Sequence, residues 1–192
     1  VNDPSYRNTS FDELVVVYSE QAKGLLDGGI DIFLVETVFD TLNCKAALYA
    51  INKTLKKSNL DIPIFASGTI TDASGRTLSG QTVEAFWNSI KHVNPAAVGL
   101  NCALGAEQIR PWLNELSIIA ETNVFVYPNA GLPNELGEYD QSPEDMAKIV
   151  AQFAKDGLVN LVGGCCGTTP DHIRTIHKSI QNQKPRKIPT IE

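Results

Sequence analysis

The chain has 192 residues, 43% of them hydrophobic, which is enough to bury one substantial core. Its 16 basic and 22 acidic side chains give a net charge of -6, and no stretch gathers enough Lys or Arg to neutralise a row of phosphates, so nucleic acid is excluded as a partner. The apolar runs fall far short of the ~20 residues that span a bilayer, and no signal-peptide pattern opens the chain. We therefore expect no membrane partner.

The cysteines indicate the redox compartment. There are four, at positions 44, 102, 165 and 166, and they lack the spaced arrangement of a secreted disulfide framework. We therefore expect a reducing, cytoplasmic location. In such a compartment, clustered cysteines more often bind a metal or take part in catalysis than form cross-links.

Helix and strand signals alternate along the chain. Ser10, with Glu13 three residues later, predicts the start of a first helix. The apolar run 30–35 predicts a strand, and Asp40 is placed to cap the helix that follows. The alternation continues with strands predicted over 62–67, 96–100, 124–128 and 158–163, and helices over 83–93, 106–120, 143–155 and 170–180.

The strand pattern predicts the fold class. Each strand is an apolar run rather than an apolar/polar alternation, which is typical of a parallel sheet covered by helices, so the class is α/β. The strand ends lie 27 to 36 positions apart, a period that suits a (β/α)8 TIM barrel, although a doubly wound open sheet has similar units. No G-x-G-x-x-G follows a strand, which counts against the dinucleotide-binding version. Pro111 is a misfit, because proline beyond the first turn should kink its helix.

Polar residues close the predicted strands, at the end where parallel α/β folds build their active sites. These strand-terminal residues are Glu36, Ser67, Cys102, Asn129 and Cys165. They include two cysteines, and a third, Cys166, follows directly, which packing alone does not readily explain.

The segment Gly163-Gly164-Cys165-Cys166-Gly167 is the most informative in the chain. Adjacent side chains on a strand point to opposite faces, but the flanking glycines allow backbone angles that turn both sulfurs the same way. With Cys102 from a nearby strand end, three thiolates and one open position would form a catalytic rather than a structural zinc site. The pattern also admits a strained vicinal disulfide, or two small buried residues.

The remaining candidates each have an ordinary structural explanation. Cys44 lies among apolar residues of a predicted helix and is expected in the core. The histidines, His92, His172 and His177, fall on helices or their ends and are expected at the surface or as caps rather than as ligands. Glu36 follows an apolar run, where a carboxylate is costly without a partner. Its partner could be an internal salt bridge, a helix cap or a substrate ammonium, and the pattern leaves these open.

Five stretches of the chain carry a resemblance to a known family: 36–41, 67–80, 99–103, 128–131 and 163–168. In them the chain resembles the homocysteine-binding domain of the cobalamin-dependent methionine synthases. The Gly-Gly-Cys-Cys-Gly element is shared with related thiol methyltransferases, including the betaine-dependent ones. The segments 67–80 and 130–134 point to the cobalamin-dependent branch.

This resemblance implies a (β/α)8 barrel that holds Zn²⁺ through Cys102, Cys165 and Cys166. It also implies Asn129 as a fourth ligand, which homocysteine would displace on binding. Glu36 would then receive the amino group of the substrate. A further polar residue, Ser67, would lie on the wall of the substrate pocket.

The resemblance further implies the reaction and its partners. Zinc-dependent methyl transfer would convert homocysteine to methionine, with no protein nucleophile. The methyl donor would be methylcobalamin on another module of the full protein, recharged from methyltetrahydrofolate by a folate module. Three alternatives remain: a betaine- or other-donor thiol methyltransferase, a non-catalytic zinc-binding module, and a barrel that uses the cysteine pair for redox chemistry. The last has no Cys-x-x-Cys or nucleotide motif to support it.

The family pattern is only partly present. Its first strand carries an Asp-Gly-Ala-Met-Gly-like turn that has no match here, and only the last five βα units of the barrel can be counted. We therefore expect residues 1–182 to be the C-terminal portion of the barrel domain and 183–192 to be a linker toward a folate domain. We also expect residues 1–192 alone to be inactive.

Overall fold

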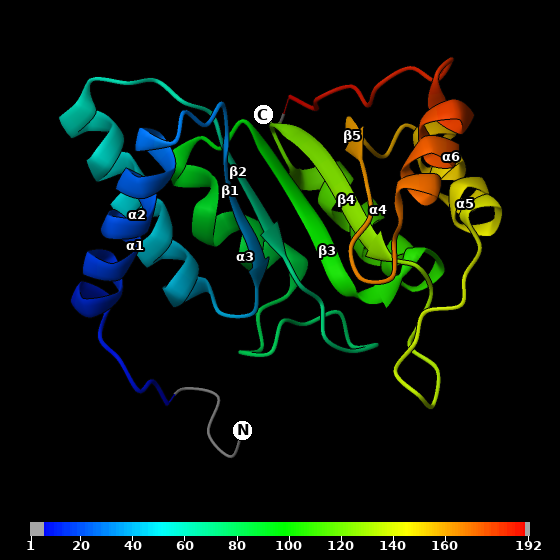
Figure 1. Ribbon diagram of the computed structural model, residues 1–192, viewed down its shortest axis with the longest axis horizontal. Helices are drawn as coiled ribbons and strands as arrows, with labels where there is room; N and C mark the ends of the chain where they lie inside the picture. Colours follow the sequence, from blue (N-terminus) through cyan, green and yellow to red (C-terminus); the bar gives the residue numbers. More distant parts are fainter. Residues whose placement is uncertain (1–5, 191–192) are drawn as a thin grey trace.

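Five parallel strands form one sheet in the order β1-β2-β3-β4-β5 (Figure 1) in a computed structural model, which describes residues 6–190. The strands are β1 (Phe33–Val38), β2 (Ile64–Gly68), β3 (Ala97–Gly105), β4 (Asn123–Asn129) and β5 (Leu161–Val162). The helices are α1 (Phe11–Asp27), α2 (Thr41–Ser58), α3 (Val83–Ile90), α4 (Ala106–Ile119), α5 (Pro143–Lys155) and α6 (Pro170–Ile180), with a 3-10 turn η1 (Lys91–Val93) after α3. The predicted α/β class is confirmed.

The strand order distinguishes a barrel arc from a doubly wound sheet. A doubly wound sheet reverses its strand order at a switch point and carries helices on both faces. Here the strands follow one another in sequence order, and the helices lie behind the sheet or beyond its two edges, leaving its front face uncovered (Figure 1). This arrangement is that of a partial (β/α) barrel, as predicted from the regular βα period.

Most helices begin and end where the local sequence signals predict. Ser10 and Glu13 form the capping box of α1, and the Asp40 side chain accepts a hydrogen bond from the Leu42 N–H at the start of α2. The helix α4 continues through Pro111 instead of ending there. Pro111 is the sixth residue of the helix. Because proline has no N–H, the helix loses one hydrogen bond, to a carbonyl of its first turn.

The strand boundaries differ more from the prediction. β1 begins at Phe33 rather than at residue 30, and β3 continues to Gly105, five residues beyond its predicted end. β5 has two residues, so Cys165 and Cys166 follow the strand rather than ending it. Each difference depends on pairing with a neighbouring strand, which a single apolar run does not reveal.

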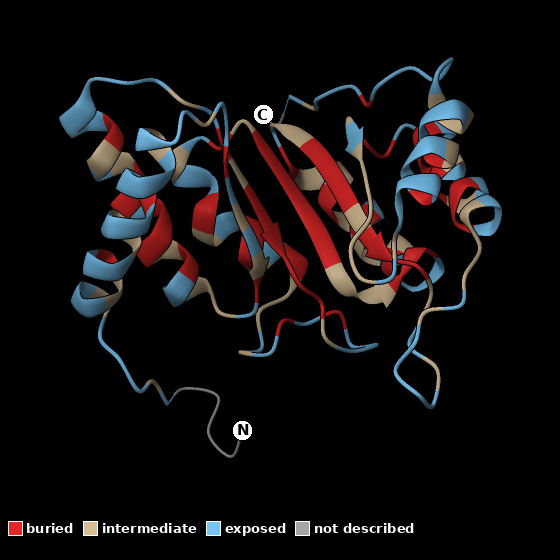
Figure 2. Ribbon diagram, viewed as in Figure 1, coloured by how far each residue is buried: buried red, intermediate tan, exposed pale blue. Residues whose placement is uncertain are grey.

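The core lies between the sheet and the helices, where Figure 2 shows the buried residues gathering along the strands and the helix faces that contact them. Cys44 is 3% exposed within this core, which confirms its predicted packing role. The largest fully buried side chains include Leu48, Phe86, Ile90, Ile109, Leu113, Phe153 and Ile176.

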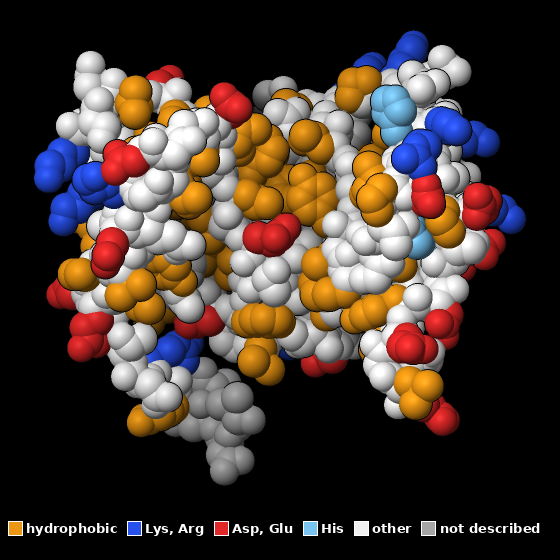
Figure 3. Space-filling model, in the orientation of Figure 1, with side chains coloured by type: hydrophobic (Ala, Val, Ile, Leu, Met, Phe, Trp, Pro, Cys, Tyr) orange, Lys and Arg blue, Asp and Glu red, His pale blue; other side chains and the backbone are white. Residues whose placement is uncertain are grey.

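The opposite face of the sheet carries apolar side chains (Figure 3) and is not covered by a helix (Figure 1), although Phe125 near its centre is fully buried. Phe125 on β4 packs between Phe65 and Tyr127, with ring centroids 5.8 and 4.8 Å away. Toward the edges of the sheet, Leu34 on β1 is 42% exposed and Leu161 on β5 is 37% exposed. β1 and β5 are therefore the open edges of the sheet, as expected for strands whose barrel neighbours are not among the described residues.

The segment after α6 packs against the domain. Arg186 is buried, and its guanidinium donates hydrogen bonds to the carbonyls of Ser117, Ala120 and Thr122 below α4. Its backbone N–H donates to Val159 O. The start of the predicted linker 183–192 is thus anchored to the domain, and residues 191–192 lie outside the described part. None of the helices in residues 6–190 is both long enough and apolar enough to span a membrane.

Candidate metal and substrate site

Three cysteine sulfurs converge at the carboxyl end of the sheet. The sulfurs of Cys102, Cys165 and Cys166 all lie within 4.8 Å of one another. Cys102 Sγ is 3.5 Å from Cys166 Sγ, and the sulfurs of Cys165 and Cys166 are 4.0 Å apart. Tetrahedral Zn²⁺ with bonds of ~2.3 Å to sulfur places its thiolate ligands roughly 3.8 Å apart. The three side chains therefore fit one zinc ion, and all are free thiols rather than a vicinal disulfide.

Cys102 reaches the cluster through an irregularity at the end of β3. Cys102 and Ala103 have φ angles of 63° and 56°, in the left-handed region that residues other than glycine rarely occupy. The register with β4 shifts between Asn101 and Gly105. Each left-handed residue costs about 1–3 kcal/mol, so the surrounding contacts must hold this conformation. Such strain often accompanies a functional site.

The Cys165–Cys166 pair lies in a turn after β5, so the alternation of side chains along a strand does not apply to it. Of the flanking glycines, Gly167 has a left-handed φ of 76°. A Cβ atom on Gly167 would lie 2.3 Å from Cβ of Tyr139, and one on Gly164 would lie 2.3 Å from Cγ2 of Thr168. The glycines therefore act mainly by permitting close approach, with positive φ required at Gly167 alone.

Burial and the neighbouring sulfurs oppose ionisation of the Cys165 thiol. Burial raises the pKa of Cys165 to about 12; a hydrogen bond from Asn101 acts in the opposite direction, and the neighbouring sulfurs of Cys102 and Cys166 raise the pKa further. Thiolates are the form that binds zinc. Three adjacent thiolates thus need a cation among them, which agrees with a metal-binding donor set.

Asn129 lies beside the cluster at the last position of β4. It is 1% exposed, and its Oδ1 accepts a hydrogen bond of 3.1 Å from the N–H of Cys166. The turn that carries the cysteine pair is further joined to β4 by hydrogen bonds from Cys165 N to Pro128 O and from Ala130 N to Cys166 O. These contacts bring the amide oxygen of Asn129 to the backbone of the turn that carries the cysteine pair.

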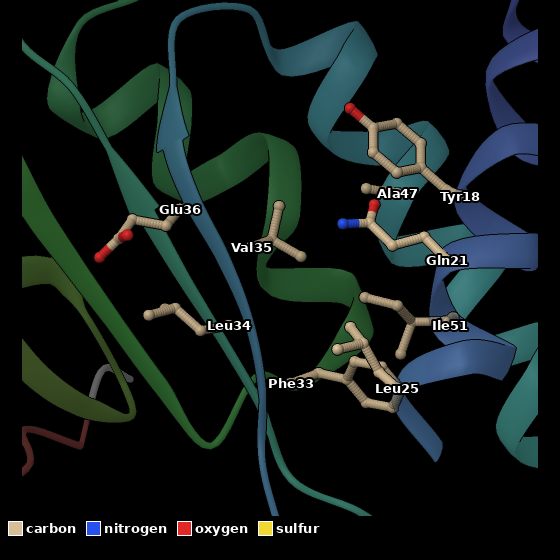
Figure 4. Close-up of a pocket in the computed structure, with 10 residues that line it drawn as sticks. Tyr18, Gln21, Leu25, Phe33, Leu34, Val35, Glu36, Ala47 and Ile51 are labelled. Atoms are coloured by element: carbon tan, nitrogen blue, oxygen red, sulfur yellow. The ribbon is translucent and has the colours of Figure 1, made fainter. Parts of the chain in front are cut away.

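Glu36 lies on the uncovered face of β1 and is exposed. Figure 4 shows Glu36 and Leu34 on one side of β1, while Phe33 and Val35 point toward the helices. Among residues 6–190, the Glu36 carboxylate forms no ion pair or hydrogen bond, so the structure shows neither an internal salt bridge nor a helix-cap contact for it. Burial, followed by the charge of Glu36, raises the pKa of Tyr127 on β4. A cavity of about 270 Å³ runs along this edge of β1.

The sequence profile for homocysteine S-methyltransferase matches residues 1–180. The chain belongs to the homocysteine S-methyltransferase family. Its fold is similar to two solved structures of the homocysteine methyltransferase MmuM from Escherichia coli. The apo form is 20% identical with a TM-score of 0.67, and the match covers 90% of this chain and 58% of that one. The metallated form is 22% identical with a TM-score of 0.65, and the match covers 91% and 54%. The chain thus spans little more than half the length of these relatives.

Within this homocysteine S-methyltransferase domain, Ser67 is fully buried, and its hydroxyl donates a 2.7 Å hydrogen bond to Oδ1 of Asn101. Two residues near the cysteines were not predicted from the sequence. Asn101 donates to the Cys165 sulfur, and the side chain of Tyr139 packs against Gly167, directly after Cys166. The position of Asn101, directly before a strand-terminal cysteine, was an available signal. Tyr139 lies in an irregular loop with no comparable signal.

The histidines of the domain do not join the metal cluster. His172 is buried and caps α6, because its Nδ1 accepts from the N–H of Thr169 while its Nε2 bonds to the carbonyl of Gln141. His92 and His177 are exposed. All three therefore have the surface or capping roles predicted for them.

Proposed function

We propose that this domain binds zinc and homocysteine in an enzyme that methylates homocysteine to methionine. The observation that carries the proposal is the convergence of the Cys102, Cys165 and Cys166 sulfurs at the carboxyl end of the sheet in a domain of this family. Three protein sulfurs leave one position of a tetrahedral ion open to exchange, as in catalytic rather than structural zinc sites. Asn129 is the proposed occupant of that position before substrate binds, because its amide oxygen lies beside Cys166.

The nucleophile in this proposal is the sulfur of the substrate. A free thiol has a pKa of ~8.5 and is mostly protonated at neutral pH, and bound zinc would favour its thiolate form. Protein residues then bind and orient the amino acid. Glu36 is proposed to accept hydrogen bonds from the substrate ammonium, since its carboxylate is free on the same face of the sheet. The aromatic rings of Phe125 and Tyr127 pack together on this face.

The proposed methyl donor is methylcobalamin, carried on another module and recharged from methyltetrahydrofolate by a folate module. The segments 67–80 and 130–134 support this branch of the family over a betaine-dependent one. Both branches use the same cysteine triad, so the cysteines do not separate them.

The test combines metal analysis with donor choice in the natural protein. We expect one zinc ion per chain, and an added sulfur ligand in the zinc X-ray absorption spectrum when homocysteine is present. We expect methionine to form with methylcobalamin and not with betaine. Zinc held by four permanent protein ligands would instead favour a non-catalytic module. Methionine formed with betaine would support the proposed methyltransferase function but would contradict the proposal that methylcobalamin is the methyl donor.

A further inference from the structure

Asn101 occupies a buried position between the cysteine cluster and the strand that carries Glu36. Its side chain is fully buried at the end of β3. Oδ1 accepts hydrogen bonds from the Thr37 N–H at 3.1 Å, from the Ser67 hydroxyl at 2.7 Å and from the Thr69 hydroxyl at 3.5 Å. Nδ2 donates to Thr37 Oγ1 at 2.9 Å and to Cys165 Sγ at 3.8 Å. One carboxamide thus contacts β1, the end of β2 and the metal cluster.

The orientation of this carboxamide follows from its partners. The Thr37 backbone N–H can only donate, so the atom that faces it must be the amide oxygen. The amino group is then directed toward the Cys165 sulfur. Both amide protons and the oxygen are engaged, so rotation of the side chain would break several buried hydrogen bonds at once.

Thr37 is the second residue on which this hydrogen-bond network depends. Its φ angle is 59°, a left-handed conformation that is strained for a β-branched residue. The two hydrogen bonds with Asn101, one at the backbone N–H and one at the hydroxyl, hold it there. Because Glu36 directly precedes Thr37, the backbone conformation at Thr37 also influences the course of β1 at Glu36.

We propose that Asn101 is a positioning residue that donates a hydrogen bond to the metal-binding sulfur of Cys165 and also fixes the strand end that carries Glu36. The proposal rests on the zinc- and homocysteine-binding function proposed above. A donor to a thiolate ligand sets its orientation and reduces the negative charge that it places on the metal. The same carboxamide therefore influences the metal cluster and the proposed ammonium-binding residue together.

The substitution Asn101→Asp removes the donor to sulfur. Aspartate has nearly the same shape and keeps an oxygen for Thr37, Ser67 and Thr69, but a carboxylate oxygen replaces the nitrogen that donates to Cys165 Sγ and to Thr37 Oγ1. The Thr37 hydroxyl can donate to that oxygen instead, whereas the Cys165 thiolate has no proton to donate. We expect the zinc affinity of the natural protein to fall by about 10- to 100-fold, the range found for partners that orient metal ligands. We also expect the sulfur-to-metal charge-transfer band of the Co²⁺-substituted protein to shift.

Asn123→Asp provides the matched control. Asn123 lies at the opposite end of the sheet, where its Nδ2 donates to Ala96 O. The control introduces the same chemical change away from the cysteines, and its zinc affinity and Co²⁺ spectrum should equal those of the wild type. If Asn101→Asp binds zinc as tightly as the control and gives an unchanged spectrum, the proposed role of Asn101 is wrong.

A second measurement needs no variant and covers the case in which Asn101→Asp does not fold. In protein labelled with ¹⁵N-asparagine and loaded with ¹¹³Cd²⁺, the Asn101 amide protons should shift on metal loading, and one should couple to ¹¹³Cd through the Cys165 sulfur. An Asn101 signal that is unchanged by the metal overturns the proposal. The proposed function fails separately, when the wild-type protein binds neither zinc nor homocysteine.

Discussion

The cysteine cluster and Glu36 lie on the same sheet but in different surroundings. The cysteines are half-buried, and hydrogen bonds join the turn that carries Cys165 and Cys166 to the end of β4. Glu36 is exposed on the edge strand β1, beside an open cavity. The metal-binding half of the proposed site is thus assembled within the described residues. The substrate-binding half faces an uncovered edge, and a complete barrel would place a further strand there.

The largest effect is expected at the cysteines. Cys165→Ala removes one of three ligands, so we expect its zinc content to fall from one ion per chain to nearly none, measured by elemental analysis after dialysis. Cys44→Ala is the matched control, because Cys44 is buried in the core with its pKa raised to about 12, mainly by burial. The control should retain its zinc. Full zinc occupancy in Cys165→Ala would contradict the assignment.

The second prediction concerns the open edge of β1. A complete barrel of eight βα units needs about 250 residues, whereas the described part of this chain forms five strands. The exposed Leu34 and Leu161 and the unpaired edges favour association or partial unfolding. We therefore expect residues 1–192 alone to aggregate and to show no methyl transfer with methylcobalamin.

A version extended at its N-terminus by further barrel strands provides the comparison. Light scattering and a methionine assay on both proteins measure the effect of covering the edge. A soluble monomer of residues 1–192 that forms methionine at the rate of the extended version would show that the substrate-binding half is complete in itself.

The third prediction concerns the anchor beneath the metal-binding half. Arg186 donates to three carbonyls around the end of α4, and its backbone is joined to Val159 before β5. Arg186→Ala leaves buried carbonyls without partners, so we expect a loss of about 2–4 kcal/mol in the free energy of unfolding. Urea unfolding monitored by the fluorescence of the two tryptophans, Trp87 in α3 and Trp112 in α4, would measure this loss.

Arg174 supplies a control for Arg186, because its ion pair with Asp171 is solvent-exposed. Arg174→Ala should change the free energy of unfolding by less than about 1 kcal/mol. If the Arg186→Ala and Arg174→Ala proteins unfold at the same urea concentration, residues 183–190 behave as a linker rather than as part of the domain.

The fourth prediction separates the two halves of the site. Glu36→Gln removes the charge proposed to meet the substrate ammonium but leaves the three sulfurs in place. Hydrogen bonds to charged groups contribute about 1.5–3 kcal/mol, so homocysteine affinity should weaken roughly 10- to 100-fold by calorimetry. Zinc content should be unchanged. Unaltered homocysteine affinity would mean that Glu36 has no role in substrate binding. Loss of zinc together with homocysteine affinity would mean that the metal-binding and substrate-binding halves depend on each other.

Local chemistry explains which parts of the molecule the sequence predicts. The capping box of α1 and the bounds of α5 and α6 follow from signals within a few residues, and the structure confirms them. The convergence of Cys102 with Cys165 and Cys166 was predicted because the carboxyl ends of parallel strands share one edge of a sheet.

The unpredicted features depend on distant contacts. Cys102 and Ala103 have a left-handed backbone, but neither is a glycine, so the sequence gives no signal of this conformation. The hydrogen bonds of Asn101 join it to Thr37 and Cys165, each 64 positions away in the chain. A pattern of residue types contains no information on such pairings until the strands are placed side by side.

The smallest effect is expected at Asn129, at the boundary between the two halves. Its oxygen already accepts a hydrogen bond from Cys166, and a water molecule can occupy the space that Asn129→Ala leaves, both as a partner for that N–H and as an exchangeable zinc ligand. We therefore expect zinc affinity to fall by less than about tenfold, which corresponds to less than 1.4 kcal/mol. Homocysteine affinity should stay equal or rise slightly, since the substrate then displaces water instead of an attached side chain. Competition with a colourimetric chelator, with and without homocysteine, measures both quantities. Loss of zinc as complete as in Cys165→Ala would make Asn129 a permanent ligand, and the open position required for homocysteine would then not exist.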